Sequence, residues 1–374
     1  MQKPMRVMLV TRSLMMGGTQ RHIVKLCRAL AQENVSISVC LLIGDEPRDL
    51  EHELPEQTKL YTCPYKRHDL RTVFWLASIV RTEKSQLVHS FSWHADFYSS
   101  LLKFLIRGLV VIGSERGDRG TQSFYKPAYN WIDRSVVFHL VDRVCANSHF
   151  GKQLLIESGC SPRKISVIPN GIILPMIDSE PMASVRELLD WPPLSTVCCI
   201  VSRLVSYKGL DKFINLVKFC DPMTRFVVIG EGPEKRCLLE QINSNALNER
   251  VILVGQIDPA IPYIKNADVC ILPTISESEH CSNSILEYMA CGKPVIAMDV
   301  SGNPELINPE ISGFLVEPSE MEKMAFYINL LAANKDLAMQ MGLAGRKRIE
   351  ESFNMISIAN RFHSLWQESL TKVL

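Results

Sequence analysis

The sequence predicts an α/β protein made of two doubly wound domains in tandem. Its 374 residues are long for a single hydrophobic core, which favours two domains. Short β-branched runs alternate with longer helical segments, the pattern of parallel strands joined by crossover helices. The turn "VIPNGI" separates two such series. We therefore expect one domain over residues 1–172 and a second from residue 173.

Ten apolar runs are the predicted strands. The first domain contains "RVMLVT" (6–11), "ISVCLL" (37–42), "LVHSFS" (87–92), "VVIGSE" (110–115) and "RVCANS" (143–148). The second contains "TVCCIVSRL" (196–204), "RFVVIGEG" (225–232), "VILVG" (251–255), "DVCILP" (268–273) and "PVIAMD" (294–299). Ligands of doubly wound sheets bind at the carboxyl ends of the strands, so the loops that follow these runs are the candidate functional segments.

The composition, 47% hydrophobic and 22% charged, is typical of a globular protein. The 12 cysteines include no CxxC pair, so we expect reduced thiols rather than a zinc site or a disulfide framework. The opening "MQKPMRVMLVT" does not have the pattern of a signal peptide, and no apolar run reaches the roughly 18 residues of a membrane-spanning helix. These features favour a cytoplasmic location.

Charge is divided unevenly along the chain. Residues 1–172 hold 23 Lys and Arg against 15 Asp and Glu, a net +8, while the remainder carries −7. One interpretation is that the first domain faces an anionic partner. The other is that two solvated surfaces simply differ in charge.

Two loops indicate phosphate chemistry. In "MMGGTQRHIV", Gly17 and Gly18 separate a strand from a helix for which Thr19 is a plausible N-cap. Exposed amides at such a helix start favour an anion, although a tight turn explains two glycines equally well. In "SRLVSYKGLDKFI", Arg203 and Lys208 follow a strand, where two cations can neutralise a diphosphate or can simply be solvated.

The segment "SESEHCSNSILEYMAC" places two carboxylates, Glu279 and Glu287, between a strand and the turn at Gly292. A capping box from Ser284 to Glu287 is one interpretation, and it would leave a helix of only about seven residues. With Ser282 as the cap, Glu287 is available to accept hydrogen bonds from a ribose diol.

The segment "VHSFSWHADFYSSLL" carries the histidine candidates His94 and His89. A histidine beside Trp93 is, on the residues alone, more simply interpreted as part of the core.

The ordered set of motifs resembles the retaining glycosyltransferases of glycosyltransferase family 4. The resemblance covers nearly the whole chain and rests on "GGTQRHIVKLCRAL", "VCANSHFGKQLL", "ISVIPNGI", "SRLVSYKGLDKFI", "FVVIGEGPEKRCLLEQI", "NADVCILPTISESEHCSNSILEYMACGKPVIAMDVSGNPELI" and "SGFLVEP". It implies the GT-B fold, two Rossmann-like domains facing a central cleft. The first domain would bind the acceptor, residues 173–355 would bind the nucleotide sugar, and a helix over 356–374 would pack back on the first domain.

The resemblance also implies a role for each site residue. Arg203 and Lys208 would hold the donor's diphosphate, and Glu287 the ribose hydroxyls. Glu279 would hold the donor sugar together with the backbone at His280, Cys281, Ser282 and Asn283, and His94 would face that sugar. Gly17 and Gly18 would approach the donor from the other domain, and Gly230, Glu231 and Gly232 would help form the nucleotide pocket. No metal or cofactor is implied, because the two cations stabilise the leaving diphosphate.

Two positions depart from the family's usual pattern. Gln20 stands where many members carry Glu, and His280 replaces a flexible glycine, which changes the room beside the donor sugar.

The implied partners are a UDP- or GDP-sugar and a glycan or lipid-linked acceptor, in cell-surface polysaccharide or lipopolysaccharide synthesis. We expect no nucleic-acid partner. Basic and apolar residues mix in "YKRHDLRTVFW" (65–75) and "LLKFLIRGLVVI" (101–112), which favours peripheral attachment to an anionic membrane. The second segment could equally be a buried helix end and strand. Two other functions remain open, a sugar-nucleotide epimerase of the same fold and a non-catalytic partner of another enzyme.

Overall fold

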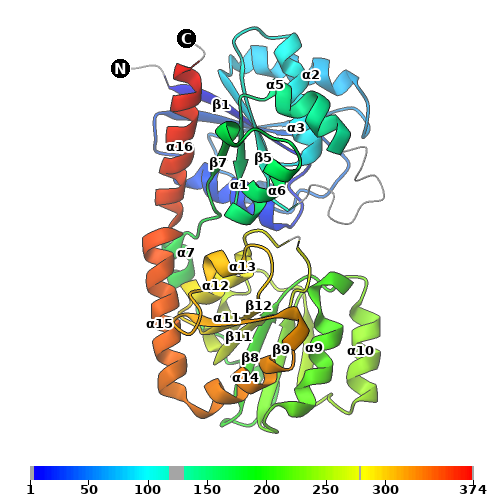
Figure 1. The fold of residues 1–374 in the computed structure, drawn as a ribbon, viewed down its shortest axis with the longest axis vertical. Coiled ribbons are helices and arrows are strands. Elements are labelled where there is room, and N and C mark those ends of the chain that lie inside the picture. The colour runs from blue at the N-terminus through cyan, green and yellow to red at the C-terminus, as the bar shows by residue number, and fades with distance from the viewer. Residues whose placement is uncertain (1–3, 118–129, 278, 373–374) are drawn as a thin grey trace. The chain divides into compact units, whose positions relative to one another are not determined.

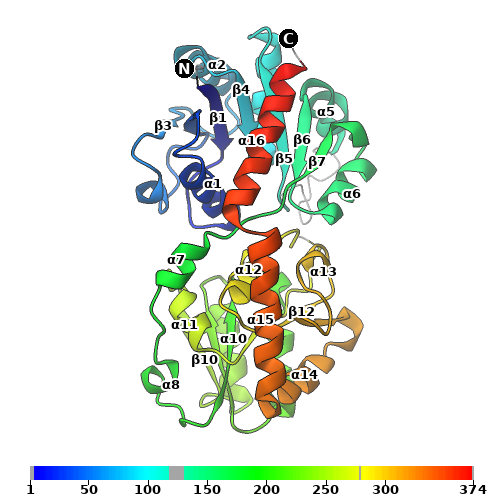
Figure 2. The same cartoon turned by 90° about the vertical axis from the view of Figure 1, so that its left-hand side faces the viewer.

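The computed structural model describes residues 4–117, 130–277 and 279–372 (Figures 1 and 2). The chain forms two compact units, Met1–Gly171 with Met355–Leu374, and Ile172–Asn354. The boundary between the two units therefore falls after Gly171, one residue before the boundary that the sequence predicts after residue 172. We call the units the N-unit and the C-unit.

The N-unit is built on a parallel sheet of seven described strands in the order β3-β2-β1-β4-β5-β6-β7. The strands are β1 (Met5–Thr11), β2 (Val35–Leu41), β3 (Lys59–Thr62), β4 (Leu87–Ser90), β5 (Val110–Glu115), β6 (Arg143–Ala146) and β7 (Ile165–Val167). The helices are α1 (Gly18–Ala29), α2 (Arg71–Glu83), α3 (Trp93–Leu101), α5 (Phe138–Leu140), α6 (His149–Glu157) and α16 (Met355–Thr371), with short turns η1 (Glu51–Glu53), η2 (Leu102–Phe104), η3 (Asp133–Val137) and η4 (Pro162–Lys164).

The C-unit is built on a second parallel sheet, of six described strands in the order β10-β9-β8-β11-β12-β13. The strands are β8 (Thr196–Val201), β9 (Thr224–Ile229), β10 (Val251–Gly255), β11 (Val269–Leu272), β12 (Val295–Met298) and β13 (Gly313–Val316). The helices are α7 (Leu174–Ser179), α8 (Val185–Leu188), α9 (Leu210–Leu216), α10 (Lys235–Ser244), α11 (Ile261–Asn266), α12 (Asn283–Ala290), α13 (Asn303–Leu306), α14 (Lys323–Ala333) and α15 (Lys335–Ser352), with short turns η5 (Ser206–Lys208), η6 (Val217–Phe219) and η7 (Pro318–Glu320).

The C-unit core has two layers, and successive side chains of the central strand β8 point alternately into one layer and the other. Cys198 and Ile200 belong to the cluster that contains residues of α9, α10 and α14. Val197 and Cys199 belong to the opposite cluster, which contains residues of α11 and α12. Successive side chains of a strand point to opposite faces, so a sheet covered on both sides needs an unbroken apolar strand. The adjacent cysteines therefore lie in different layers, and both are free thiols.

The helix α16 belongs to the N-unit and packs on α1. Its Phe362 ring lies 5.4 Å from the His22 ring, and its Trp366 Nε1 donates a hydrogen bond to His89 Nδ1 at 3.0 Å. The protonated Nε2 of His89 lies 3.0 Å from Ser114 Oγ. Burial, with the charge of Arg116, holds the pKa of His89 well below its usual range. His89 is therefore a neutral residue of the core.

Both sheets have the same reversal of strand order. In each, the first strand is flanked on one side by the next strand in the chain and on the other by a later one, β1 by β2 and β4, and β8 by β9 and β11. Such a switch point opens a crevice at the carboxyl ends of the two central strands, where α/β proteins bind ligands. The predicted fold class is confirmed, and each unit has one candidate binding position.

Candidate active site

The C-unit switch point gathers the predicted donor-site residues from two loops. Arg203 and Lys208 follow β8, while Glu279 and α12 follow β11. Cys199 and Cys270 are register partners of the two parallel strands, so the two loops leave neighbouring strand ends. The Ile275 amide donates to the Tyr207 carbonyl at 3.2 Å, which ties the loops together.

Close backbone packing holds Lys208 at this position. Gly209 follows it with a φ of +69°, and a Cβ there would lie 2.3 Å from the Pro273 carbonyl oxygen. Only glycine allows this left-handed turn against the end of β11. The Lys208 side chain is buried and forms an ion pair with Glu279. The two residues assigned to different parts of a donor therefore contact each other directly.

Arg203 differs from Lys208 in being exposed. Its guanidinium donates a hydrogen bond to the Tyr207 hydroxyl and lies 5.8 Å from the centroid of that ring. The ring holds the fork of the guanidinium beside the strand end without neutralising its charge, which suits a bidentate contact with phosphate oxygens.

The predicted nucleotide segment at Gly230–Gly232 packs on the Arg203 loop. The Leu204 amide donates to the Glu231 carbonyl at 2.9 Å. Gly230 has a φ of +146°, and a Cβ there would lie 1.9 Å from the Ser202 carbonyl oxygen, so a side chain would separate the two loops. The Glu231 carboxylate accepts a hydrogen bond from Lys235 at 2.6 Å.

Ser282 is the N-cap of α12, and its Oγ accepts from the Ile285 amide. The hydroxyl of Ser284 instead donates to the Val201 carbonyl at 2.8 Å. The capping box between Ser284 and Glu287 is therefore not formed, and the alternative with Ser282 is correct. Glu287 lies three residues beyond Ser284, on the helix side that faces the end of β8.

Tyr288 anchors α12 from within the core, and no motif in the sequence indicates this role. Its hydroxyl accepts from the Val201 amide at 2.6 Å and lies 3.4 Å from the Ile271 carbonyl. Burial raises the pKa of Tyr288 well above its usual range, so the hydroxyl keeps its proton. One side chain thus joins α12 to both central strands.

The peptide at His280–Asn283 runs from the loop into α12. His280 and Cys281 are buried, so the residue that replaces the usual glycine points into the protein. The Gly302 amide donates to the Glu279 carbonyl at 3.3 Å, and a Cβ at Gly302 would lie 1.7 Å from the His280 carbonyl oxygen. The loop after β12 therefore packs closely against the backbone of Glu279 and His280.

The remaining predicted residues lie in the N-unit. Gly17, not Thr19, is the N-cap of α1, and the helix begins at Gly18. The prediction for Thr19 is wrong because the extended backbone of Gly17 starts the helix two residues earlier, without a side-chain cap. His94 lies in the first turn of α3, just after β4.

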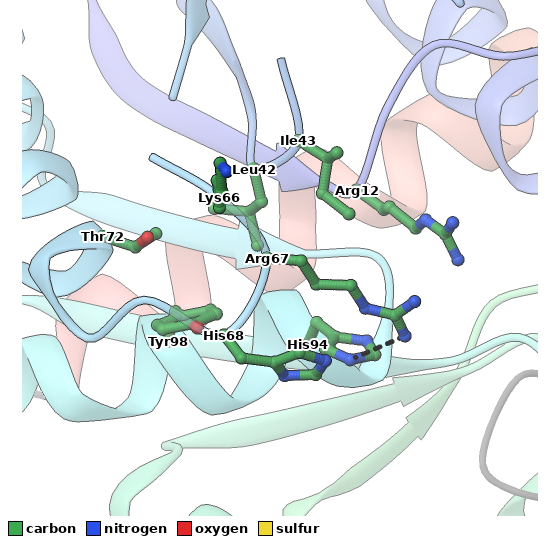
Figure 3. Close-up of a pocket in the computed structure, with 9 residues that line it drawn as sticks. All are labelled: Arg12, Leu42, Ile43, Lys66, Arg67, His68, Thr72, His94 and Tyr98. Carbon is green, nitrogen blue, oxygen red and sulfur yellow. Dashed lines mark hydrogen bonds between the residues drawn. The ribbon is translucent and has the colours of Figure 1, made fainter. Parts of the chain in front are cut away.

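A pocket at the N-unit switch point surrounds His94 (Figure 3). Its lining comes from the ends of β1 and β2, from the loop before α2, from the first turn of α2, and from α3: Arg12, Leu42, Ile43, Lys66, Arg67, His68, Thr72, His94 and Tyr98. The guanidinium of Arg67 lies 3.3 Å from His94 Nε2. Burial and the charges of Arg67, His68 and Arg12 lower the pKa of His94 to about 4. His94 is therefore neutral near pH 7.

The segment 101–112 differs from the membrane-facing surface expected of it. Lys103 Nζ contacts Asp142 at 2.8 Å and the Leu109 carbonyl at 2.9 Å, and Val110–Glu115 is the buried strand β5. Phe104 remains exposed. The alternative of a buried helix end and strand is correct for Leu102 and for 109–112, while Arg107 is exposed like Phe104.

Two family models match the chain. The family described as "Glycosyltransferase Family 4" matches residues 16–174, and the family "Glycosyl transferases group 1" matches residues 186–348. Because one match falls on each unit, the chain belongs to the GT-B glycosyltransferases of the family 4 type.

Relatives of known activity and solved structures agree with this assignment. The chain is 23% identical, over 94% of both sequences, to the UDP-Gal:alpha-D-GlcNAc-diphosphoundecaprenol alpha-1,3-galactosyltransferase of Escherichia coli. It is 25% identical to the phosphatidylinositol N-acetylglucosaminyltransferase GPI3 subunit of Saccharomyces cerevisiae, over 81% of this chain and 70% of the relative. The crystal structure of Anabaena HepE in complex with UDP has a TM-score of 0.85 at 18% identity, covering 97% of this chain and all of HepE.

Proposed function

We propose that this glycosyltransferase moves a sugar from a UDP-sugar to a lipid-linked or glycan acceptor, in the synthesis of a cell-surface polysaccharide or lipopolysaccharide. One observation carries the proposal: Arg203, the Lys208–Glu279 pair and the start of α12 meet at the C-unit switch point. UDP is preferred to GDP because HepE was solved with UDP and the Escherichia coli relative uses UDP-Gal.

The proposed donor contacts follow from this arrangement. Arg203 and Lys208 stabilise the charge that develops on the departing diphosphate, and Glu287 accepts hydrogen bonds from the ribose. Gly230–Gly232 border the nucleotide, Gly17 and Gly18 approach it from the N-unit, and the backbone of His280–Asn283 faces the sugar. When the diphosphate pairs with Lys208, Glu279 is released to bind sugar hydroxyls.

The reaction is proposed to retain the anomeric configuration. The acceptor attacks on the face that the diphosphate leaves, and a phosphate oxygen removes the acceptor's proton. With a pKa near 4, His94 is a poor base at pH 7, so we assign it a hydrogen-bonding role beside the donor sugar. The anomeric coupling of the product sugar, measured by NMR, tests this: an inverted product would contradict it.

Transfer is proposed to need no metal and no cofactor, because Arg203 and Lys208 supply the positive charge. Among the described residues, no group of three or more His, Cys, Asp and Glu could hold a metal ion. The expected result is unchanged turnover in EDTA. Activity that is lost in EDTA and restored by manganese would contradict the proposal.

Attachment to an anionic membrane is proposed through the start of α2. Leu70 and Phe74 lie one helical turn apart and are 63% and 66% exposed, and Lys66, Arg67 and Arg71 lie beside them. Each such cation contributes about 1 kcal/mol near an anionic surface, and exposed apolar side chains can enter the interface. None of the helices described is both long enough and apolar enough to cross a bilayer.

Co-sedimentation with phosphatidylglycerol vesicles tests the attachment. We expect binding that falls with salt, that weakens when Lys66, Arg67 and Arg71 are changed to Ser, and that weakens in Phe74→Ser. The matched control is Phe326→Ser, since Phe326 is 62% exposed in the C-unit. Equal recovery in the supernatant with and without vesicles at low salt would contradict the attachment.

Donor choice is tested by thermal shift with UDP, GDP and ADP. We expect UDP to stabilise the protein most, and Arg203→Ala to lose this stabilisation. An epimerase would convert the sugar nucleotide without any acceptor, and a non-catalytic partner protein would do neither. Incubation with labelled UDP-sugars, with and without lipid extract, separates these functions.

A further inference from the structure

The pocket beside His94 is formed by the strand ends of the N-unit sheet. Arg12 directly follows β1, Leu42 and Ile43 follow β2, and His94 follows β4. The space of about 280 Å³ at this position includes open solvent, so the pocket is a hollow at the surface rather than an enclosed cavity. An open hollow suits one small polar group of a ligand rather than a whole nucleotide.

The lining carries an excess of positive charge. Arg12, Lys66 and Arg67 are cations, and the carboxylate of Glu46 pairs with Arg12. Burial opposes ionisation of Glu46, but hydrogen bonds from Arg12 and Ser13 and the charge of Arg67 outweigh it and keep its pKa below the usual value. Asp69, whose charge acts on Tyr98, is itself held by Arg71. Burial is the first cause of the low pKa of His94, and the charges of Arg67, His68 and Arg12 add to it.

The chemistry of these groups suits an anion with several oxygens. Figure 3 shows the guanidinium groups of Arg12 and Arg67 on one side of the hollow, near His94, and the ammonium of Lys66 on the other side, beside Leu42. Guanidinium groups bind phosphate oxygens in pairs, while an ammonium acts as a point charge. The hydroxyls of Thr72 and Tyr98 also belong to the lining, and either can donate a hydrogen bond to an oxygen.

We propose that this pocket binds a phosphate or diphosphate group of the acceptor. The inference rests on the proposed function and deepens it, because it defines the acceptor as a phosphorylated molecule. An anion held by Arg12, Lys66 and Arg67 fixes the acceptor beside His94, the residue assigned to the donor sugar. The donor's own diphosphate has a separate set of cations, Arg203 and Lys208, in the C-unit.

The test follows the His94 ring by NMR during titration with inorganic diphosphate. His94 is assigned from the signal missing in His94→Gln. We expect saturable shifts at pH 7 and a rise in the pKa of His94 by about one unit, because a nearby anion favours the imidazolium. The response disappears in Lys66→Gln/Arg67→Gln.

The matched control is Arg71→Gln/Lys84→Gln, which removes the same charge from the two ends of α2, outside the lining. Arg71 is held by Asp69 at 2.6 Å and does not belong to the pocket. The control must keep the full His94 response. No response in the unmodified protein, or an equal response in both double variants, overturns the proposal.

Lipid headgroups are the other source of such a phosphate, and vesicles distinguish them. The protein is sedimented with phosphatidylglycerol vesicles with and without saturating inorganic diphosphate, at matched ionic strength. We expect vesicle binding to weaken but to persist, because diphosphate then occupies Lys66 and Arg67 while Leu70, Arg71 and Phe74 still contact the membrane. Complete displacement by diphosphate would assign the pocket to headgroups and overturn the acceptor assignment, whereas absence of vesicle binding excludes headgroups.

UDP binding and the His94 response together distinguish a failure of this inference from a failure of the proposed function. UDP binding, lost in Arg203→Ala, reports on the donor site in the C-unit. If UDP binds and His94 does not respond to diphosphate, only the acceptor inference fails. If His94 responds and UDP does not bind, the anion pocket stands and the proposed function fails.

Discussion

The two switch points have the same topology and different electrostatic arrangements. In the C-unit, the buried Lys208 is paired with Glu279, and Arg203 is the exposed one of these two donor-site cations. In the N-unit, Arg12 is paired with Glu46, while exposed Lys66 and Arg67 line the pocket of a neutral His94. A paired cation keeps its position until a stronger anion replaces its partner, whereas exposed cations attract an anion from a distance. Under the proposed function, the C-unit site would hold the donor firmly and the N-unit site would attract an incoming acceptor.

The largest expected effect comes from breaking the buried pair. Lys208→Met should reduce turnover at least about a hundredfold, since it removes charge stabilisation of the leaving group. It should also cost about 2 kcal/mol of stability, because the half-buried Glu279 loses its charged partner. Urea unfolding and initial rates measure the two effects.

The double variant Lys208→Met/Glu279→Gln sharpens this prediction. It should recover stability, because no unpaired charge remains, and it should not recover turnover. The control Lys347→Met removes a cation from an exposed ion pair with Glu351 and should leave the unfolding midpoint almost unchanged. Full activity in Lys208→Met would remove this residue from the mechanism.

Arg203→Ala separates catalysis from stability. We expect turnover to fall about a hundredfold with an unchanged melting temperature, because Arg203 is exposed and its guanidinium contacts the side chain of Tyr207 in its own loop. Arg236→Ala, on the exposed face of α10, is the control and should keep normal turnover. Equal rates in the two variants would contradict the assignment of Arg203.

Glu287→Ala should weaken UDP binding about tenfold, which corresponds to a lost hydrogen bond to a charged group, about 1.5 kcal/mol. Calorimetry with UDP measures this. Glu249→Ala is the control, since Glu249 is exposed near the amino end of the edge strand β10, away from the carboxyl ends of β8 and β11. Unchanged affinity in Glu287→Ala would leave that carboxylate without the ribose role.

His94 affects stability at low pH, and it has the smallest expected effect at pH 7. Its pKa is about 4 in the folded protein and about 6.5 in an unfolded chain, so the unfolded state binds a proton first as pH falls. Stability is therefore lost between about pH 6.5 and 4, by up to about 2 kcal/mol after screening by solvent.

His94→Gln should lose less stability than the unmodified protein over that range, and exposed His52→Gln should behave like the unmodified protein. Urea midpoints at pH 7 and pH 4.5 measure the difference. If His94→Gln and the unmodified protein lose the same stability between pH 7 and pH 4.5, the pKa of His94 in the folded protein is the ordinary one.

The central strands could be predicted from the sequence, and three edge strands could not. Runs such as "TVCCIV" are apolar because both faces of the sheet are covered. The missed strands β3, β7 and β13 are at sheet edges and have only three or four residues. In β3 no residue is fully buried, so "KLYT" carries no apolar run.

The residues of the candidate site could be predicted from the sequence, but the contacts between them could not. Strand ends and motifs indicated Arg203, Lys208, Glu279 and Glu287, but no spacing reveals that Lys208 pairs with Glu279 across 71 residues. Arg12 was missed, although it follows β1, the neighbour of the strand before His94. The order of the strands, which only the structure establishes, is the signal that connects them.

Transfer of label is the most direct test of the central claim, that one switch point holds the donor and the other the acceptor. The protein is incubated with radiolabelled UDP-sugars and lipid extract, and label is measured in the organic phase. We predict label there only when UDP-sugar and extract are both present, with almost none for Arg203→Ala and a reduced amount for Lys66→Gln/Arg67→Gln. Label that never leaves the sugar nucleotide, or transfer that both variants retain in full, would contradict the account.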